Sequence, residues 1–225
     1  KESSAASDVY KRQMLGTFAG TNLKEIQFPD SLKYAGYSTF CKCFCLKKIT
    51  LGTGYMGQIN PVNYCDKNGF LLPGEKSTDC FDIQIPVENK NYKVRENVIY
   101  SGDGRAVYGV TKDYQKSTLT LDKNVKVITR NAFRNTELKK VTVSGDLTII
   151  GSGVFMNNWY CKSFEVKGNI NMIDAQAFYE CHRLKEFVCV GTIKKIGTQA
   201  FRGAIKKDGI VLEDSLEAVS YTHLR

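Results

Sequence analysis

The sequence predicts an α/β repeat protein, in which short parallel β-strands line one face of a solenoid and short helical turns line the other. The first observation is a recurring phenylalanine, spaced 22, 23 and 23 residues apart: Phe133, Phe155, Phe178 and Phe201. The second is an isoleucine five residues before each of them: Ile128, Ile150, Ile173 and Ile196. Units with one apolar face are unstable alone, so we expect neighbouring units to stack around a continuous core.

The third observation is an apolar pattern, L-x-x-V-x-V, that follows each phenylalanine. Its last two apolar positions alternate, which is typical of a short strand with one buried face. Its copies contain Leu23/Ile26/Phe28, Leu46/Ile49/Leu51, Cys80/Ile83/Ile85, Leu119/Leu121, Leu138/Val141/Val143, Cys161/Phe164/Val166, Leu184/Phe187/Cys189 and Ile210/Leu212. The small residue before the ring, as in Ala132-Phe133, predicts the tight helical turn. We therefore expect about eight coils over residues 14–219.

Two stretches interrupt this regular pattern. Residues 52–79 form a longer glycine-rich loop without the alanine–phenylalanine pair. Residues 87–115 contain an insert with two apolar segments, Val98–Tyr100 and Ala106–Val110, joined at Gly102-Asp103-Gly104. Alternating apolar residues around a glycine-rich turn predict a β-hairpin there.

The two ends of the chain do not share the repeat pattern. Residues 1–13 and 220–225 resemble peptides that arise when sequencing-adapter DNA is translated together with a coding sequence. We therefore expect both segments to be non-native and leave them out of the fold prediction.

The repeats resemble those of a known family. The segments "VITRNAFRNTELKKVTV", "MIDAQAFYECHRLKEFVCV" and "KIGTQAFRGA" are similar to BspA-like leucine-rich repeats, whose pattern runs I-G-x-x-A-F-x-x-C-x-x-L-x-x-V-x-I-P. The resemblance covers most of residues 14–219, and the hairpin is similar to one often seen within this family. It implies a leucine-rich-repeat solenoid in a secreted or cell-surface protein that takes part in adhesion and recognition.

Several motifs for catalysis or cofactor binding are absent or incomplete. No apolar run approaches the roughly 20 residues that cross a bilayer. Gly52–Gly57 spells G-x-G-x-x-G, but Asn60-Pro61 follows where a dinucleotide site requires a helix. His182 lies on a repeat turn, where its position suggests no orienting acid, and carboxylates fall in different columns. We expect no catalytic residue, cofactor or metal.

The eight cysteines do not follow zinc-site spacing. Cys43 and Cys181 stand three residues after a phenylalanine, and several others occupy strand positions, so buried thiols are the expected state. A disulfide between Cys65 and Cys80, or within the cluster at residues 41–45, remains open.

A column of lysines is the main candidate for a binding site. The first variable position of successive strands holds Lys24, Lys47, Lys139, Lys162 and Lys185, and then Asp208, while Lys48 and Lys140 lie next to two of them. Parallel strands are about 4.8 Å apart, so these side chains are expected to form a ladder on an exposed face. The ladder fits an acidic ligand and the net charge of +9. Alternatively, the lysines only solvate the sheet and oppose aggregation.

Trp159 and Tyr160 lie beside a one-residue expansion in their repeat. Exposed aromatic residues there can anchor a partner, whereas buried ones would pack within the longer turn. Both interpretations stay open at this point.

These observations favour a non-catalytic recognition module that contacts a protein or surface glycan through its strand face and adjoining loops. The alternative is an accessory targeting repeat of a larger enzyme, such as a cell-wall or protein hydrolase. We do not expect nucleic-acid binding, because few aromatic residues alternate with the lysines as stacking platforms would require.

Overall fold

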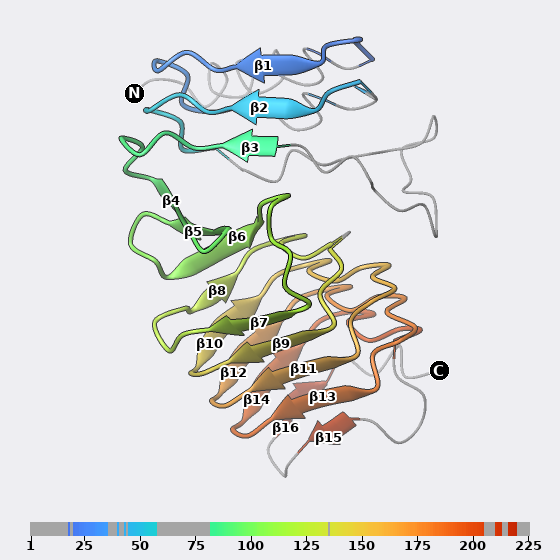
Figure 1. Cartoon of the computed structure of the whole chain (residues 1–225). Helices are drawn as coiled ribbons and strands as arrows, with labels where there is room; N and C mark the ends of the chain where they lie inside the picture. Colours follow the sequence, from blue (N-terminus) through green and yellow to red (C-terminus); the bar gives the residue numbers. More distant parts are fainter. Residues whose placement is uncertain are drawn as a thin grey trace, which may run out of the picture. The chain divides into compact units, whose positions relative to one another are not determined.

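The structure is a computed structural model, which describes residues 18, 20–35, 40, 43, 45–57, 82–134, 136–204, 210–212 and 216–219 (Figure 1). In the last two ranges only the backbone is described. The chain forms two compact units, Lys1–Tyr92 and Lys93–Arg225. Both predicted non-native ends and most of the predicted loop at 52–79 lie outside the described residues.

The first unit contains a parallel three-stranded sheet in the order β1-β2-β3. Its strands are β1 (Glu25–Gln27), β2 (Lys48–Thr50) and β3 (Asp82–Gln84). All three occupy copies of the L-x-x-V-x-V pattern, as predicted. Phenylalanine rings from successive coils stack on one another in this unit. The centroid of the Phe40 ring lies 5.8 Å from that of Phe18 and 6.0 Å from that of Phe28.

The second unit contains a parallel five-stranded sheet in the order β15-β13-β11-β9-β7 (Figure 1). Its strands are β7 (Thr118–Leu121), β9 (Lys140–Val143), β11 (Ser163–Val166), β13 (Glu186–Cys189) and β15 (Ile210–Leu212). The apolar residues at the second and fourth positions of β7, β9, β11 and β13 are buried, and the residues between them point outward. The predicted strand slots are therefore confirmed here too.

A second sheet of eight strands, in the order β16-β14-β12-β10-β8-β6-β5-β4, was not predicted. Its solenoid strands are β8 (Val127–Ile128), β10 (Leu147–Ile150), β12 (Ile170–Ile173), β14 (Ile193–Ile196) and β16 (Leu216–Val219). Each ends with a residue of the recurring isoleucine column or its equivalent. In β10 the buried residues are Leu147 and Ile150, three positions apart. This spacing differs from the alternation of a regular strand, so the period-two rule missed these strands.

The turns that were predicted to be helical are not helical, which corrects the α/β assignment: the described residues contain no helix. In these turns the described residues include seven with a left-handed backbone, with φ between 55° and 71°. They precede and follow the phenylalanine by two residues, and comprise Asn131, Gly153, Gln176 and Gln199, then Asn157, Glu180 and Gly203. A right-handed helix cannot contain such residues. The second unit is therefore a parallel β-solenoid.

The predicted hairpin is confirmed and is longer than expected. β5 (Val98–Ser101) pairs antiparallel with β6 (Ala106–Val110), and β6 pairs in parallel with β8, so that the insert extends the eight-stranded sheet. An additional strand, β4 (Tyr92–Arg95), precedes them. The turn between β4 and β5 has positive φ at both central residues, Glu96 (46°) and Asn97 (62°), as in tight two-residue hairpins.

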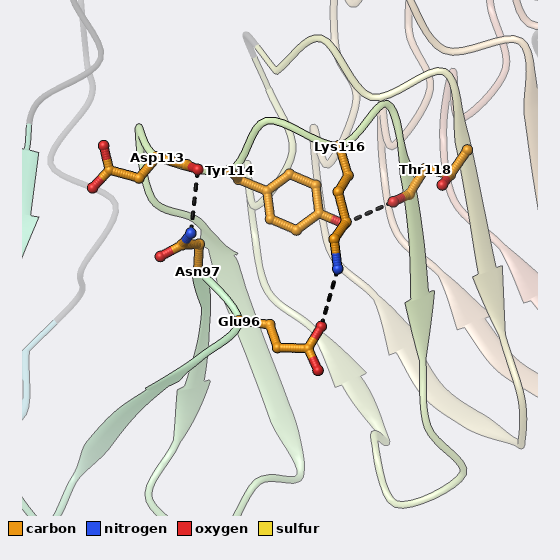
Figure 2. A network of polar contacts seen from close by, with 6 residues as sticks. All are labelled: Glu96, Asn97, Asp113, Tyr114, Lys116 and Thr118. Atoms are coloured by element: carbon orange, nitrogen blue, oxygen red, sulfur yellow. Dashed lines mark hydrogen bonds and ion pairs between the residues drawn. The ribbon is translucent and has the colours of Figure 1, made fainter.

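Polar contacts join this turn to the segment that leads into β7 (Figure 2). The Lys116 ammonium lies 3.2 Å from a Glu96 carboxylate oxygen. The Asn97 amide donates to the Asp113 carbonyl at 3.2 Å, and the Tyr114 hydroxyl donates to the Thr118 carbonyl at 2.7 Å. The insert is thus tied to both sheets of the second unit.

Phenylalanine rings form the core of the second unit. Phe178 stacks on Phe155 and Phe201, with centroid distances of 5.7 and 5.1 Å, and meets Phe164 and Phe187 edge-on at 5.2 and 5.4 Å. Every coil therefore gains most of its apolar contacts from its immediate neighbours, as expected for a solenoid.

A buried asparagine closes one turn in each unit in the same way. Asn158 donates its amide to the carbonyls of Phe133 (3.2 Å) and Thr136 (3.0 Å), and its oxygen accepts from the backbone N–H groups of Tyr160 and Cys161, both at 2.8 Å. Asn89 bonds in the same pattern to two carbonyls and two N–H groups of the first unit. Each of these two side chains therefore makes four hydrogen bonds to the backbone, which hold its turn in place.

Candidate functional site

Three predicted lysines of the second unit stack in register beside the five-stranded sheet. The backbone N–H of Lys162 donates to the Lys139 carbonyl at 2.8 Å, and that of Lys185 donates to the Lys162 carbonyl at 2.9 Å. All three residues are exposed. Because each lies immediately before its strand and parallel strands are about 4.8 Å apart, the three form one column along the solenoid. We call these three residues the lysine column.

The ammonium groups of the lysine column make no ion pair or side-chain hydrogen bond within the part of the chain that the structure describes. Neighbouring charged side chains, in contrast, contact other side chains. Lys140 lies 3.5 Å from Glu165, and the Glu186 carboxylate accepts a hydrogen bond from the Ser163 hydroxyl at 2.9 Å. Within the described ranges, the Glu165 and Glu186 carboxylates on this face therefore contact side chains other than those of the lysine column.

The remaining predicted lysines belong to the first unit. Lys24 and Lys47 are exposed and stack in register, with the Lys47 N–H donating to the Lys24 carbonyl at 2.7 Å. Lys48 is half-buried, and in the sheet it lies between Glu25 and Asp82. Its charge is thus flanked by two carboxylate-bearing residues, whereas Lys24 and Lys47 repeat the arrangement of the lysine column over two coils.

The outward face of the five-stranded sheet is rich in hydroxyl groups. In register, one row across the sheet contains Thr118, Lys140, Ser163 and Glu186, and the next contains Thr120, Thr142, Glu165 and Val188. Hydroxyl groups both donate and accept hydrogen bonds, so this face suits a neutral polar surface beside the charged column. The prediction from the sequence covered the lysine positions only and did not include these rows of hydroxyl groups.

The structure brings Trp159 together with His182. Trp159 is 41% exposed, and its ring centroid lies 5.1 Å from that of the His182 ring. Nε2 of His182 lies 3.1 Å from a Glu180 carboxylate oxygen, and its Nδ1 lies 3.1 Å from the Gly203 carbonyl oxygen. Tyr160, the second predicted aromatic residue, is half-buried in the turn closed by Asn158.

This cluster corrects the prediction that His182 has no acidic neighbour. Glu180 and His182 are two residues apart on a turn, and the left-handed backbone at Glu180, with φ of 55°, is not apparent from the sequence. One signal was present, however: Trp159 and His182 are 23 residues apart, which is one repeat. Side chains at equal positions in adjacent coils are expected to meet.

The neighbouring cysteines are not suited to nucleophilic chemistry. Cys181 is buried, its thiol donates to the Phe155 carbonyl at 2.8 Å, and burial raises the pKa of this thiol far above its ordinary range. Burial likewise raises the pKa of the Cys161 thiol to about 12. The thiolate is the nucleophilic form, so a Cys181–His182 pair has no reactive thiol at neutral pH.

The buried state predicted for the cysteines is confirmed at four positions: Cys43, Cys161, Cys181 and Cys189. Cys45 is exposed. Cys41, Cys65 and Cys80 lie outside the described residues, so the pairings left open there stay open.

The glycine motif at Gly52–Gly57 has a packing role. A side chain at Gly52 would collide with the Pro29 carbonyl of the preceding coil. The carbonyls of Gly52 and Tyr55 accept hydrogen bonds from the buried Asn89 amide, at 2.9 and 3.0 Å. Among the described residues, no group of His, Cys, Asp or Glu is arranged to hold a metal ion, and none of them belongs to a helix capable of spanning a membrane.

Solved structures confirm the fold. The crystal structure of the pneumococcal vaccine antigen PcpA is similar with a TM-score of 0.55 and 18% identity, covering 90% of this chain and 58% of that one. A leucine-rich repeat protein from Eubacterium ventriosum is similar with a TM-score of 0.52 and 16% identity, covering 90% and 64%. The chain thus spans less than two thirds of either protein.

The family comparison agrees with the sequence resemblance. No curated protein matches the chain. The model of the BspA type leucine-rich repeat region matches in six copies, over residues 14–65 and 112–222, and leaves out the predicted hairpin. These matched residues make up well over half of the sequence, and they contain the phenylalanine turns and every strand slot described above except that of β3. The chain therefore belongs to the BspA type leucine-rich-repeat family.

Proposed function

We propose that this chain is a non-catalytic recognition module of a secreted or cell-surface protein. It binds an acidic protein or glycan through the outward face of its five-stranded sheet. The observation that carries the proposal is the lysine column: three exposed ammonium groups in register, without anionic partners among the described residues. Lys24 and Lys47 offer a second, shorter set in the first unit.

Unpaired like charges are unfavourable in the free protein. Two unit charges about 5 Å apart in water repel by about 1 kcal/mol, and salt weakens this repulsion. Two such neighbouring pairs exist in the lysine column. An anionic ligand removes the repulsion, so its binding is stronger than three isolated lysines would provide.

The proposed location rests on family membership and on one structural neighbour. The structural neighbour PcpA is a pneumococcal vaccine antigen. The role in binding is supported by the repeats themselves, because stacked leucine-rich repeats form extended surfaces that suit partner binding. A non-catalytic role is supported by the described residues, which present no reactive thiol–histidine pair.

The test compares two variants with equal loss of charge. In the first, Lys139, Lys162 and Lys185 are replaced by glutamine; in the control, Lys123, Lys194 and Lys195 are replaced, which are also exposed but lie outside the five-stranded sheet. Binding to immobilised heparin and to immobilised poly-glutamate is measured from 50 to 200 mM salt.

We expect the column variant to lose at least tenfold in affinity for one or both polymers, and the control to lose about twofold or less. Equal losses in both variants would show that only the net charge matters and would overturn the proposal. Thermal unfolding of both variants checks that the fold is intact.

A further inference from the structure

We infer that the ligand is an acidic polysaccharide, which packs one sugar ring on Trp159 and places the anionic groups of adjacent sugars on Lys162 and Lys185. This inference rests on the proposed function, because it uses the same lysine column. It adds the chemical class of the ligand and a second contact point, the aromatic pair of Trp159 and His182.

The Trp159 ring is exposed but held in place. Its neighbour His182 is fixed on two sides, by the Glu180 carboxylate and the Gly203 carbonyl, each 3.1 Å from a ring nitrogen. The Trp159 side chain remains 41% exposed while its ring contacts this fixed imidazole. A ring that is already ordered loses little conformational freedom when a ligand packs on it, which favours binding.

Two turns, one in each of two adjacent coils, connect the aromatic pair to the lysine column. Trp159 precedes Lys162 by three residues, and His182 precedes Lys185 by three, so each pair of Cα atoms is at most about 11 Å apart. Asn158 anchors the first of these turns through hydrogen bonds to the N–H groups of Tyr160 and Cys161. A ligand that covers both features therefore spans about two sugar rings.

Sugar chemistry matches each part of this surface. A pyranose ring has a flat face of C–H groups that packs on an indole, and its hydroxyls can bond to the threonine and serine rows next to the column. A linear polymer with regularly spaced carboxylates or sulfates suits a column with one ammonium group per coil. Lysine stems are flexible, so the spacing need not match closely.

Other acidic polymers fit the same surface less well. Single-stranded nucleic acid gains affinity from successive stacking platforms, whereas the outward rows of β7, β9, β11 and β13 contain no aromatic residue. An acidic polypeptide can neutralise the lysines but has no flat C–H face for Trp159. Both serve as competitors in the test.

The full chain contains a single tryptophan, so its tryptophan emission, excited at a wavelength that tyrosine does not absorb, reports on Trp159 alone. The chain is titrated with heparin oligosaccharides, oligogalacturonate, poly-glutamate and a single-stranded DNA oligonucleotide of similar charge. We expect a saturable change in tryptophan emission with at least one of the two acidic sugars and tighter binding of that sugar than of the other polymers.

Calorimetry then compares Trp159→Ala and Trp159→Phe with Tyr34→Ala, a matched control at a 57% exposed aromatic residue of the first unit. Trp159→Ala should weaken the binding of the sugar about tenfold, and Trp159→Phe should keep most of the original affinity. The affinity for poly-glutamate should not change in either variant. The control should bind the sugar like the original chain.

The outcomes separate this inference from the proposed function. If the lysine-column variant loses binding while Trp159→Ala binds sugar normally, the recognition surface stands and the sugar inference is overturned. Tighter binding of poly-glutamate or DNA than of both sugars overturns it as well. If none of the four polymers binds, the proposed function falls together with it.

Discussion

The two units form the same kind of coil, but only the second shows a second parallel solenoid sheet among the described residues. In the second unit, Leu147 and Ile150 follow the strand residue Val143 by four and seven positions and form β10. At the same offsets from Phe28, the first unit has Leu32 and Ala35, and residues 29–35 contain no strand. Isoleucine favours strands and alanine does not. The comparison is consistent with the β-branched residue at this position favouring the second sheet.

Other features are shared by both units. The buried asparagine, the stacked rings and the in-register lysines occur in each, because they depend on the turn and on the first strand. Three predictions test how far this likeness extends, and they are given in order of decreasing expected effect.

The largest effect is expected at the phenylalanine core. Phe178→Ala removes a ring that contacts four other rings, and should lower the free energy of unfolding by about 3–5 kcal/mol. Phe40→Ala in the first unit removes a ring with two described ring contacts and should cost less. Urea denaturation of the full chain measures both. An equal or larger loss for Phe40→Ala would show that the first unit is packed as extensively as the second.

An intermediate effect is expected at the two asparagines. Asn158→Ala and Asn89→Ala each leave four backbone groups without their side-chain partner, and should each cost about 2–3 kcal/mol. Asn171→Ala, at an exposed position of β12 (Ile170–Ile173), should change stability by no more than about 0.5 kcal/mol. Clearly different costs for Asn158 and Asn89 would contradict the equivalence of the two turns.

The smallest effect per residue is expected from the buried thiols at alkaline pH. The pKa of Cys161 is raised to about 12 in the folded chain, so its thiol contributes stability that is fully present below the unfolded pKa near 8.5. This contribution is lost as pH rises from there towards 12. Between pH 8 and 10 the Cys161 contribution should fall by about 1–2 kcal/mol.

The pKa of Cys181 is raised in the same direction and adds to the loss. Chemical denaturation at a series of pH values measures it. Replacing both cysteines with alanine should remove this part of the pH dependence, although the variant starts from a lower stability. An unchanged pH dependence would mean that other groups cause the alkaline loss.

The sequence by itself determined the features that repeat along the chain. The regular spacing of the phenylalanines, the eight strand slots and the hairpin could be located because each depends on a local pattern of apolar residues and turns. The buried cysteines and the exposed lysines followed from their columns, since equal positions in successive coils share one environment. The use of those lysines as a binding site stays a prediction.

Only the tertiary structure decided what happens between coils. The left-handed residues around each phenylalanine made the turns non-helical, and pairing between neighbouring coils created the second sheet. A contact across one repeat placed Trp159 against His182, which also pairs with Glu180 on its own turn. Another contact between coils joined Lys140 to Glu165, while Lys162 has no acidic partner among the described residues. The physical reason is that these interactions depend on distances and backbone angles between coils, which no pattern within one repeat specifies.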